Sequence, residues 1–203
     1  MQYLKNDIRH KILDAAKKEF IEKGFKGSSM RSIAALSGVT TSNIYNYYQS
    51  KDQIFQEILA PLLECFRKLE EDHNSPERIS LRIFDSKEEQ QLRINQLVDL
   101  ILIHRDELKL LLFKSHGSSL ESFRDEYTNR QTVMGLEYCK MISDKYPYIQ
   151  SDISEFFLHS MSSWIITIIG EIVSHNLSPE DIERFVGEYI EFLTAGWKKM
   201  MRA

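Results

Sequence analysis

The spacing of apolar residues predicts helices along the whole chain. Ile8, Ile12, Ala16 and Phe20 recur at intervals of four residues, and Gly24 follows them. Such spacing is typical of one apolar face of a helix, and glycine commonly ends a helix because it adopts left-handed backbone angles without strain. We therefore expect a first helix that ends near Gly24.

Two short helices and one longer helix are expected next. A helix over residues 30–36 is interrupted at Gly38, a second short helix covers residues 40–47, and a further helix runs from Lys51 to about residue 72. Glycine supplies the backbone freedom that a tight turn between two helices requires. The two short helices therefore predict a helix-turn-helix arrangement.

The rest of the chain predicts a body of longer helices. They are expected over residues 87–104, 105–115, 120–145, 152–175 and 179–201. The chain holds only 8 glycines and 4 prolines in 203 residues, about half the usual share of these turn-forming residues. The predicted fold class is therefore all-α, with an N-terminal helix-turn-helix domain over residues 1–50 and a helical domain over residues 51–203.

Several function classes find no support in the sequence. The longest uncharged stretch, residues 156–170, has 15 residues, whereas a membrane-spanning helix needs about 20, so we interpret it as a buried helix. The N-terminal segment is too polar for a secretory signal, and Cys65 and Cys139 lack the spacing of a metal site or a disulfide framework. No catalytic or phosphate-binding motif occurs. We expect a cytoplasmic protein that is not an enzyme, with no metal, no cofactor and no membrane partner.

Charge is distributed unevenly along the chain. Residues 1–52 carry nine basic and five acidic residues, and the remainder carries 17 basic and 25 acidic residues. A basic N-terminal quarter favours a polyanion partner at that end. Imbalances of this size are also common on protein surfaces, so charge alone leaves both interpretations open.

The composition of the predicted helix over residues 40–47 favours nucleic acid. Its side chains are mostly hydroxyls, amides and phenols, and it contains no acidic residue. A buried helix would be more apolar, and a solvated helix would carry more Lys and Glu. Hydroxyl and amide groups hydrogen-bond to base edges and phosphates, so this surface suits the major groove of DNA.

A gap-free series of short motifs runs through residues 6–58. It comprises Gly24-Phe25, Gly27-Ser28-Ser29-Met30-Arg31, Ile33-Ala34, Ser37-Gly38-Val39, Ile44-Tyr45-Asn46-Tyr47-Tyr48 and Ser50-Lys51-Asp52. Together these motifs resemble the DNA-binding domain of tetracycline-repressor-type (TetR family) regulators. The resemblance implies a homodimeric repressor that binds a palindromic operator in double-stranded DNA and carries an effector pocket in each helical body.

The resemblance also implies a set of DNA-contacting residues. Base edges are assigned to Thr40, Thr41, Ser42 and Asn46, phosphates to Ser29, Asn43, Tyr45, Tyr47 and Lys51, and either partner to Arg31. Tyr45 and Tyr47 have an alternative role as cover for the small core, and Arg31 as an ordinary surface charge. Tyr48 stands where the family more usually has Phe, so we expect it to be buried with a partner for its hydroxyl.

The body offers candidates for effector binding and for dimerisation. The effector candidates are His104, Phe113, Tyr127, Gln131, Met134, Tyr138 and Trp164. Aromatic, Met and isolated polar side chains suit a small apolar or amphipathic ligand, although such polar residues are also common in ordinary cores. For the dimer, we expect the helix over residues 152–175 and one face of the last helix to pair with their symmetry mates. The alternative is that the helix over residues 152–175 is a core helix of a monomer. That face comprises Phe185, Val186, Tyr189, Ile190, Leu193 and Trp197.

Two alternative functions remain open from the sequence. The first is a TetR-like regulator controlled by a protein partner in place of a small molecule. The second is a helical interaction module whose helix-turn-helix serves only as scaffold. An enclosed cavity in the body would favour the small-molecule effector, and the acid-free helix over residues 40–47 favours DNA binding.

Overall fold

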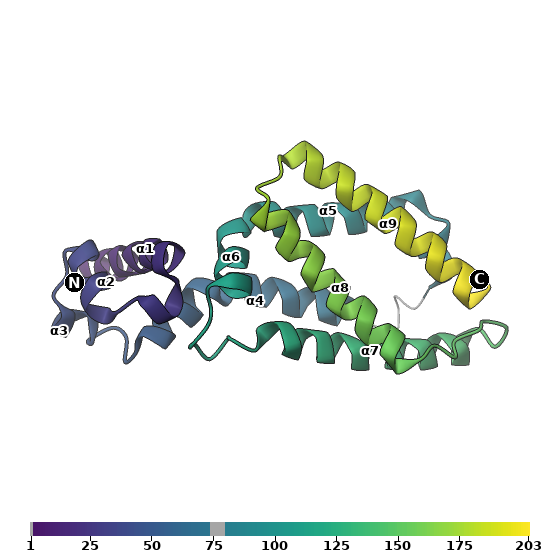
Figure 1. Ribbon diagram of the computed structural model, residues 1–203, viewed down its shortest axis with the longest axis horizontal. Coiled ribbons are helices and arrows are strands. Elements are labelled where there is room, and N and C mark those ends of the chain that lie inside the picture. Colours follow the sequence, from purple (N-terminus) through teal and green to yellow (C-terminus); the bar gives the residue numbers. More distant parts are fainter. Residues whose placement is uncertain (1, 74–79) are drawn as a thin grey trace. The chain divides into compact units, whose positions relative to one another are not determined.

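The structure, a computed structural model, describes residues 2–73 and 80–203 (Figure 1). Within these residues the secondary structure is helical and no strand occurs, which confirms the all-α class. The elements are α1 (Gln2–Gly27), α2 (Met30–Ser37), α3 (Thr41–Ile44), α4 (Lys51–His73), the 3₁₀ helix η2 (Leu81–Phe84), α5 (Lys87–Ile103), α6 (Arg105–Phe113), α7 (Phe123–Lys145), α8 (Glu155–Ser174) and α9 (Pro179–Met201).

The chain forms two compact units. The first contains the residues up to Glu64 together with Asp106–Phe123, and the second contains Cys65–Arg105 together with Arg124–Ala203. The first half of α4 and most of α6 thus pack with the N-terminal helices, beyond the boundary at residue 50 expected from the sequence. The functional division at that boundary stays a prediction.

The first unit is built around an apolar core that joins α1, α2, α3 and α4. Ile12, Ile33 and Ile44 are completely buried. The rings of Phe20 and Phe55 meet edge to face with centroids 5.1 Å apart, a favoured geometry for aromatic pairs. The helices α1, α2 and α3 thus each contribute a buried isoleucine to this core, beside the aromatic rings of α1 and α4.

Gly24 marks a break within α1. Its φ of 70° and ψ of 170° are not helical, and the amide of Phe25 turns away to donate to the carbonyl of Lys114 at 2.8 Å. Only glycine adopts such angles at little cost. The predicted end of the first helix at Gly24 therefore corresponds to this break, although helical turns continue to Gly27.

A buried carboxylate links α1 to α2. Glu19 is 1% exposed and pairs with Lys23 at 3.0 Å. Burial raises the pKa of Glu19, but hydrogen bonds from Ser32 and Lys23 outweigh this, so that its pKa lies below the ordinary value. The ionised form is therefore the one that the folded unit favours.

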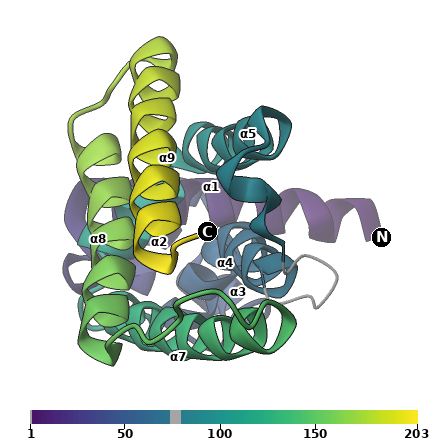
Figure 2. The same ribbon diagram turned by 90° about the vertical axis from the view of Figure 1, so that its right-hand side faces the viewer.

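The second unit is a ring of helices. The rings of Phe66 on α4 and Tyr127 on α7 lie 5.2 Å apart, and the side chain of Leu158 on α8 lies against Gly135 of α7. Figure 2 shows α8 and α9 side by side, in agreement with the 5.6 Å between the rings of Phe157 and Trp197. Helix α9 packs on α5, so that α4, α7, α8, α9 and α5 surround a common interior.

Helix α8 is the one helix of the described residues that is long and apolar enough to cross a membrane by length and composition. Its most apolar window has a mean hydropathy of 1.5, and 44% of that window is buried here. Core helices of soluble proteins share these properties. Its contacts with α7 and α9 agree with the interpretation as a packed helix of the second unit.

Candidate nucleic-acid interface and cavity

Local hydrogen bonds fix the two short helices of the helix-turn-helix. Ser29 caps α2 in a reciprocal arrangement, because its hydroxyl accepts from the amide of Ser32 at 3.0 Å and its own amide donates to the Ser32 hydroxyl at 3.0 Å. Gly38 ends α2 with left-handed angles of φ 68° and ψ 15°, and Thr40 caps α3. The turn between the helices therefore rests on one glycine that needs positive φ.

Helix α3 is shorter than the predicted helix over residues 40–47. It covers Thr41–Ile44, and the following amides of Asn46 and Tyr47 bond to carbonyls three residues back, Asn43 and Ile44, at 3.1 and 2.9 Å. Asn, Thr and Tyr are modest helix formers. The segment consequently continues as a tight turn over residues 45–47. Residues 40–47 together are called the coiled stretch below.

Most of the predicted DNA-contacting residues lie at the surface of this coiled stretch and of α2. Exposed positions are Ser29, Arg31, Thr40, Ser42, Tyr45 and Asn46, whereas Thr41, Asn43, Tyr47 and Lys51 are half-buried. Tyr45 exposes 54% of its surface, so it does not serve as core cover. Asn46 donates to the side chain of Asn43 at 3.2 Å, which pre-orients both amides.

The electrostatics of this surface favour an anionic partner. No Asp or Glu occurs between Lys23 and Lys51. Arg31 is exposed and has no ion pair within the described part of the chain. An unopposed positive charge beside exposed hydroxyls and amides attracts phosphate groups.

Lys51 is an exception among the predicted contacts, because its side chain turns inward. Its ammonium group donates to the carbonyls of Phe25 at 2.5 Å and Ser28 at 2.8 Å and lies 4.1 Å from the centre of the Phe25 ring. Burial lowers its pKa below the ordinary value for lysine. The ammonium group therefore holds the turn before α2 against the start of α4, and its contact with a phosphate stays a prediction.

Tyr48 is buried, as expected, and the structure shows its partners. It is 2% exposed, its hydroxyl donates to the Glu57 carboxylate at 3.0 Å, and Arg9 donates to it at 3.3 Å. Arg9 and Glu57 also pair directly at 2.8 Å. The sequence predicted a partner but could not identify it, because the three residues come from separate parts of the chain.

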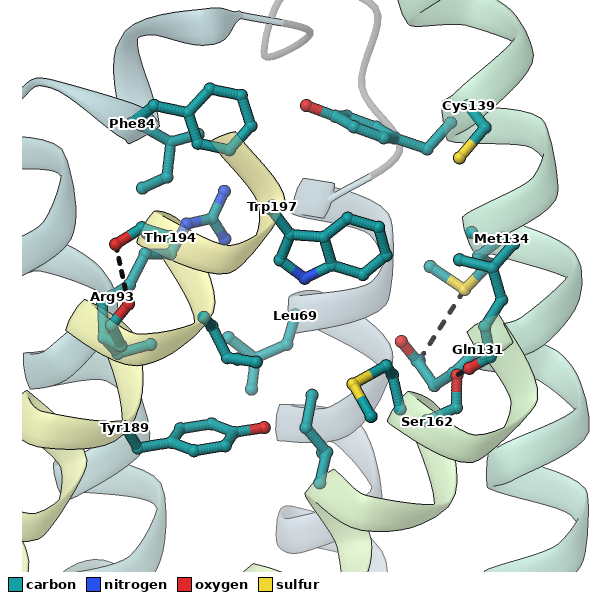
Figure 3. Close-up of a pocket in the computed structure, with 18 of the residues that line it drawn as sticks. Leu69, Phe84, Arg93, Gln131, Met134, Cys139, Ser162, Tyr189, Thr194 and Trp197 are labelled. Atoms are coloured by element: carbon teal, nitrogen blue, oxygen red, sulfur yellow. Dashed lines mark hydrogen bonds between the residues drawn. The ribbon is translucent and has the colours of Figure 1, made fainter. Parts of the chain in front are cut away.

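A cavity of about 400 Å³ lies inside the second unit (Figure 3). This volume falls within the range of about 300–1,000 Å³ typical of small-molecule sites. Most of its walls are apolar side chains of α7, α8 and α9, with Leu69 on α4 and Phe84 on η2. Four of the seven predicted effector contacts line it: Tyr127, Gln131, Met134 and Tyr138.

The other three predicted effector contacts lie elsewhere. His104 follows the end of α5, with its Nε2 3.4 Å from the sulfur of Cys65. Phe113 belongs to the first unit and is 48% exposed. Trp164 packs on the rings of Tyr189 and Phe192 and does not line the cavity. These three residues were chosen because they are aromatic or lie in an apolar stripe of a helix. Such a stripe does not show which part of the interior is left unfilled.

The apolar face of α9 also has a different place from the one expected. Tyr189, Ile190, Leu193 and Trp197 line the cavity, so these four side chains face the interior of the second unit, and their part in a dimer stays a prediction. The large apolar side chains of α8 and α9 that remain exposed are Phe156 at 79%, Phe192 at 64% and Met200 at 37%. The face of α9 that was expected to form the dimer does not include Phe192 or Met200.

No group of three or more His, Cys, Asp or Glu residues that could hold a metal ion occurs within residues 2–73 and 80–203. Both cysteines are free thiols.

Comparison with known proteins identifies the family. The family model described as bacterial regulatory proteins, tetR family, matches residues 12–58, which include α2, α3 and the start of α4. This segment belongs to the TetR family. Over 70 residues, it is 31% identical to an uncharacterized HTH-type transcriptional regulator of Bacillus subtilis, YhgD, covering 34% of this chain and 37% of that protein.

Other proteins match more of the chain at lower identity. The HTH-type transcriptional repressor KstR2 of Rhodococcus jostii is 26% identical over 135 residues, covering 65% of this chain and 64% of the repressor. Among solved structures, NalD of Pseudomonas aeruginosa, the secondary repressor of a multidrug efflux pump, is similar with a TM-score of 0.57 and 20% identity, covering 92% and 94% of the two chains. The curated relatives are thus matched over less than two thirds of their own length, and the structural likeness establishes the shared fold.

Proposed function

We propose that this TetR-family chain is a cytoplasmic, DNA-binding transcriptional repressor that binds a palindromic operator as a homodimer and is released by a small apolar or amphipathic effector. The observation that carries the proposal is the exposed surface of α2 and α3, which contains no Asp or Glu and on which Arg31 is exposed without an ion pair among the described residues. Regulation by an effector is favoured over control by a protein partner because the second unit contains a cavity of suitable size.

Binding to DNA is tested by selection of bound duplexes from random DNA. We expect a palindromic consensus, since a symmetric dimer presents the same surface to each half-site. Affinity for that duplex is then measured by fluorescence anisotropy between 50 and 300 mM salt. If roughly six phosphates are contacted per dimer, log K falls against log salt with a slope of about −5. Enrichment of no sequence, with no affinity at low salt, refutes the proposal.

Base contacts are tested by Thr41→Ala and Asn46→Ala. Each variant is expected to lose about 1–3 kcal/mol of discrimination at one base pair and to leave affinity for unrelated duplexes unchanged. Gln49→Ala is a matched control, because Gln49 is exposed and lies just outside the predicted contacts. A uniform loss on all duplexes would assign Thr41 and Asn46 to the backbone instead.

The dimer is proposed to form through the outer faces of α8 and α9. Phe156 and Phe192 expose large apolar surfaces there, and exposed aromatic side chains are typical of protein interfaces. Phe192→Glu is expected to give a folded monomer in sedimentation velocity experiments. Leu92→Glu is the control, because Leu92 on α5 is similarly exposed, at 50%, and should leave the dimer intact. A dimer that survives Phe192→Glu would place the interface elsewhere.

A further inference from the structure

Tyr189 presents an unsatisfied hydrogen-bonding group to the cavity. The residue is 6% exposed, and its buried hydroxyl has no hydrogen-bond partner among the described residues. Burial raises the pKa of Tyr189, so the hydroxyl stays protonated and available as a donor. Buried hydroxyls are nearly always paired in folded proteins, and an exception calls for a ligand or another explanation.

The charges that line the cavity leave one cation unpaired. Glu70 accepts hydrogen bonds from Gln131 at 3.1 Å and from Arg130 at 3.4 Å, and Glu89 pairs with Arg82 at 3.5 Å. Arg93 also lines the cavity. It is half-buried and has no ion pair or hydrogen bond within the part of the chain that the structure describes. Each carboxylate therefore has an arginine partner, Arg130 or Arg82, that does not line the cavity, while Arg93 has no carboxylate partner among the described residues.

The two polar groups lie apart from each other. In Figure 3 the guanidinium of Arg93 lies on the side of Phe84, and the hydroxyl of Tyr189 points into the cavity from the opposite end of the view. The wall between these ends is mainly apolar and includes Leu69, Leu158 and Leu193. The arrangement suits an elongated molecule that is apolar along its length and polar at its ends.

We infer that the cavity binds an apolar monocarboxylate whose carboxylate pairs with Arg93 and whose far end carries an oxygen that accepts a hydrogen bond from Tyr189. This inference rests on the proposed function of the cavity as the effector site. A guanidinium pairs well with a carboxylate through two parallel hydrogen bonds. A ligand with several negative charges is disfavoured because Glu70 and Glu89 share the same walls, and a cation is disfavoured because both carboxylates already have partners.

The head group is tested with three probes of equal chain length: dodecanoate, dodecanol and dodecylamine. Binding to the purified full-length protein is measured by calorimetry. We expect dodecanoate to bind at least about tenfold more tightly than either of the others, a difference that one charge-assisted hydrogen-bonded pair readily supplies. Arg93→Met should remove this preference and leave dodecanol binding unchanged, which also shows that the variant cavity is intact.

The matched control for Arg93 is Arg184→Met. Arg184 stands on α9, pairs with Glu188 at 3.1 Å and is largely exposed, and it does not line the cavity. It should keep the full preference for dodecanoate. Equal binding of the three probes to the wild-type protein, or a preference that survives Arg93→Met, overturns the inference.

The far end is tested with 12-hydroxydodecanoate. Its additional hydroxyl should improve affinity over dodecanoate by about fivefold, a typical contribution of one neutral hydrogen bond. Tyr189→Phe should abolish this improvement and leave dodecanoate affinity unchanged. An improvement that persists in Tyr189→Phe, or none in the wild type, refutes the role of Tyr189.

These outcomes are separate from those of the proposed function. Binding of all probes without selectivity refutes only the ligand class, while operator binding and its release by other molecules still stand. Failure of the wild-type protein to bind any operator refutes the proposed function even if dodecanoate binds selectively. Absence of binding for every probe refutes the inference directly.

Discussion

Replacement of Lys51 by methionine separates two roles for this residue. Methionine keeps an unbranched chain that still contacts Phe25 but removes the ammonium group, which donates to the carbonyls of Phe25 and Ser28 at 2.5 and 2.8 Å. If these bonds define its role, the variant loses stability. If Lys51 instead contacts a phosphate, the variant keeps its stability and loses an ionic contact with DNA.

The expected loss of stability follows from the two hydrogen bonds. Bonds that involve a charged group contribute about 1.5–3 kcal/mol each. The carbonyl of Phe25 also accepts from the amide of Ser28 at 3.3 Å, so it remains partly satisfied, and the half-buried site admits water. We therefore expect Lys51→Met to reduce the free energy of unfolding by about 2 kcal/mol.

Two measurements decide between the roles. Urea unfolding gives the stability, and operator affinity as a function of salt gives the number of ionic contacts. We expect reduced stability with an unchanged salt slope, because no phosphate contact is lost. Lys18→Met is the control, since Lys18 is exposed on α1 and should change neither quantity. Wild-type stability together with a slope shallower by about 2, from one lost contact per protomer, would refute the inward role of Lys51.

Three further variants test the first unit. Gly38→Ala should lower the free energy of unfolding in urea by about 1 kcal/mol, because this turn requires a positive φ. The control is Gly187→Ala in helix α9, which has open space around it and should instead raise the free energy of unfolding. Because the pKa of Glu19 is lowered on folding, its ionised form stabilises the fold above about pH 4, and this stability is lost as the pH falls through the folded pKa. In acid titration followed by circular dichroism, Glu19→Gln should show a smaller loss of stability over this pH range. Tyr48→Phe removes one shared hydroxyl but keeps the pair of Arg9 and Glu57, so thermal unfolding should show a loss of about 1 kcal/mol; no loss would mean that the hydroxyl contributes nothing.

The sequence predicted the helices best where their boundaries depend on local signals. Helix α9 covers Pro179–Met201 as expected, because a serine cap, a proline in the first turn and two acidic residues there act without distant partners. Helix α3 was overestimated, since the residues after Ile44 are poor helix formers and settle into tighter turns. The packing of Asp106–Phe123 with the N-terminal helices was not predicted, because it depends on contacts between residues far apart in sequence, such as Phe25 with Lys114.

The residues of the candidate sites could be predicted only in part, because some of their positions depend on contacts between residues far apart in sequence. Arg31, Tyr45 and Asn46 are exposed, as their assignment to DNA from the sequence requires. The direction of the Lys51 side chain could not be predicted, because a long flexible chain reaches either outward to a phosphate or inward to carbonyls that lie more than twenty residues away. The position of the cavity could not be predicted either. Hydrophobic periodicity shows which residues face inward, but it does not show how completely they fill the interior.

The connectivity of the chain bears on how ligand binding would change DNA binding. The residues that line the cavity stand on α4, α5 and α7 as well as on α8 and α9. The chain passes from one unit to the other at Glu64, at Arg105 and at Phe123, and each of these positions belongs to α4, α6 or α7. A ligand that favours one arrangement of α4 therefore acts on a helix whose residues up to Glu64 belong to the unit with the helix-turn-helix. Only its difference in affinity between two arrangements can shift DNA binding, and about 1–3 kcal/mol of such coupling changes operator affinity by roughly 5- to 150-fold. For the ligand class inferred above, Arg93 on α5 and Tyr189 on α9 would fix the orientation, while contacts with Leu69 on α4 and Gln131 on α7 would carry the difference.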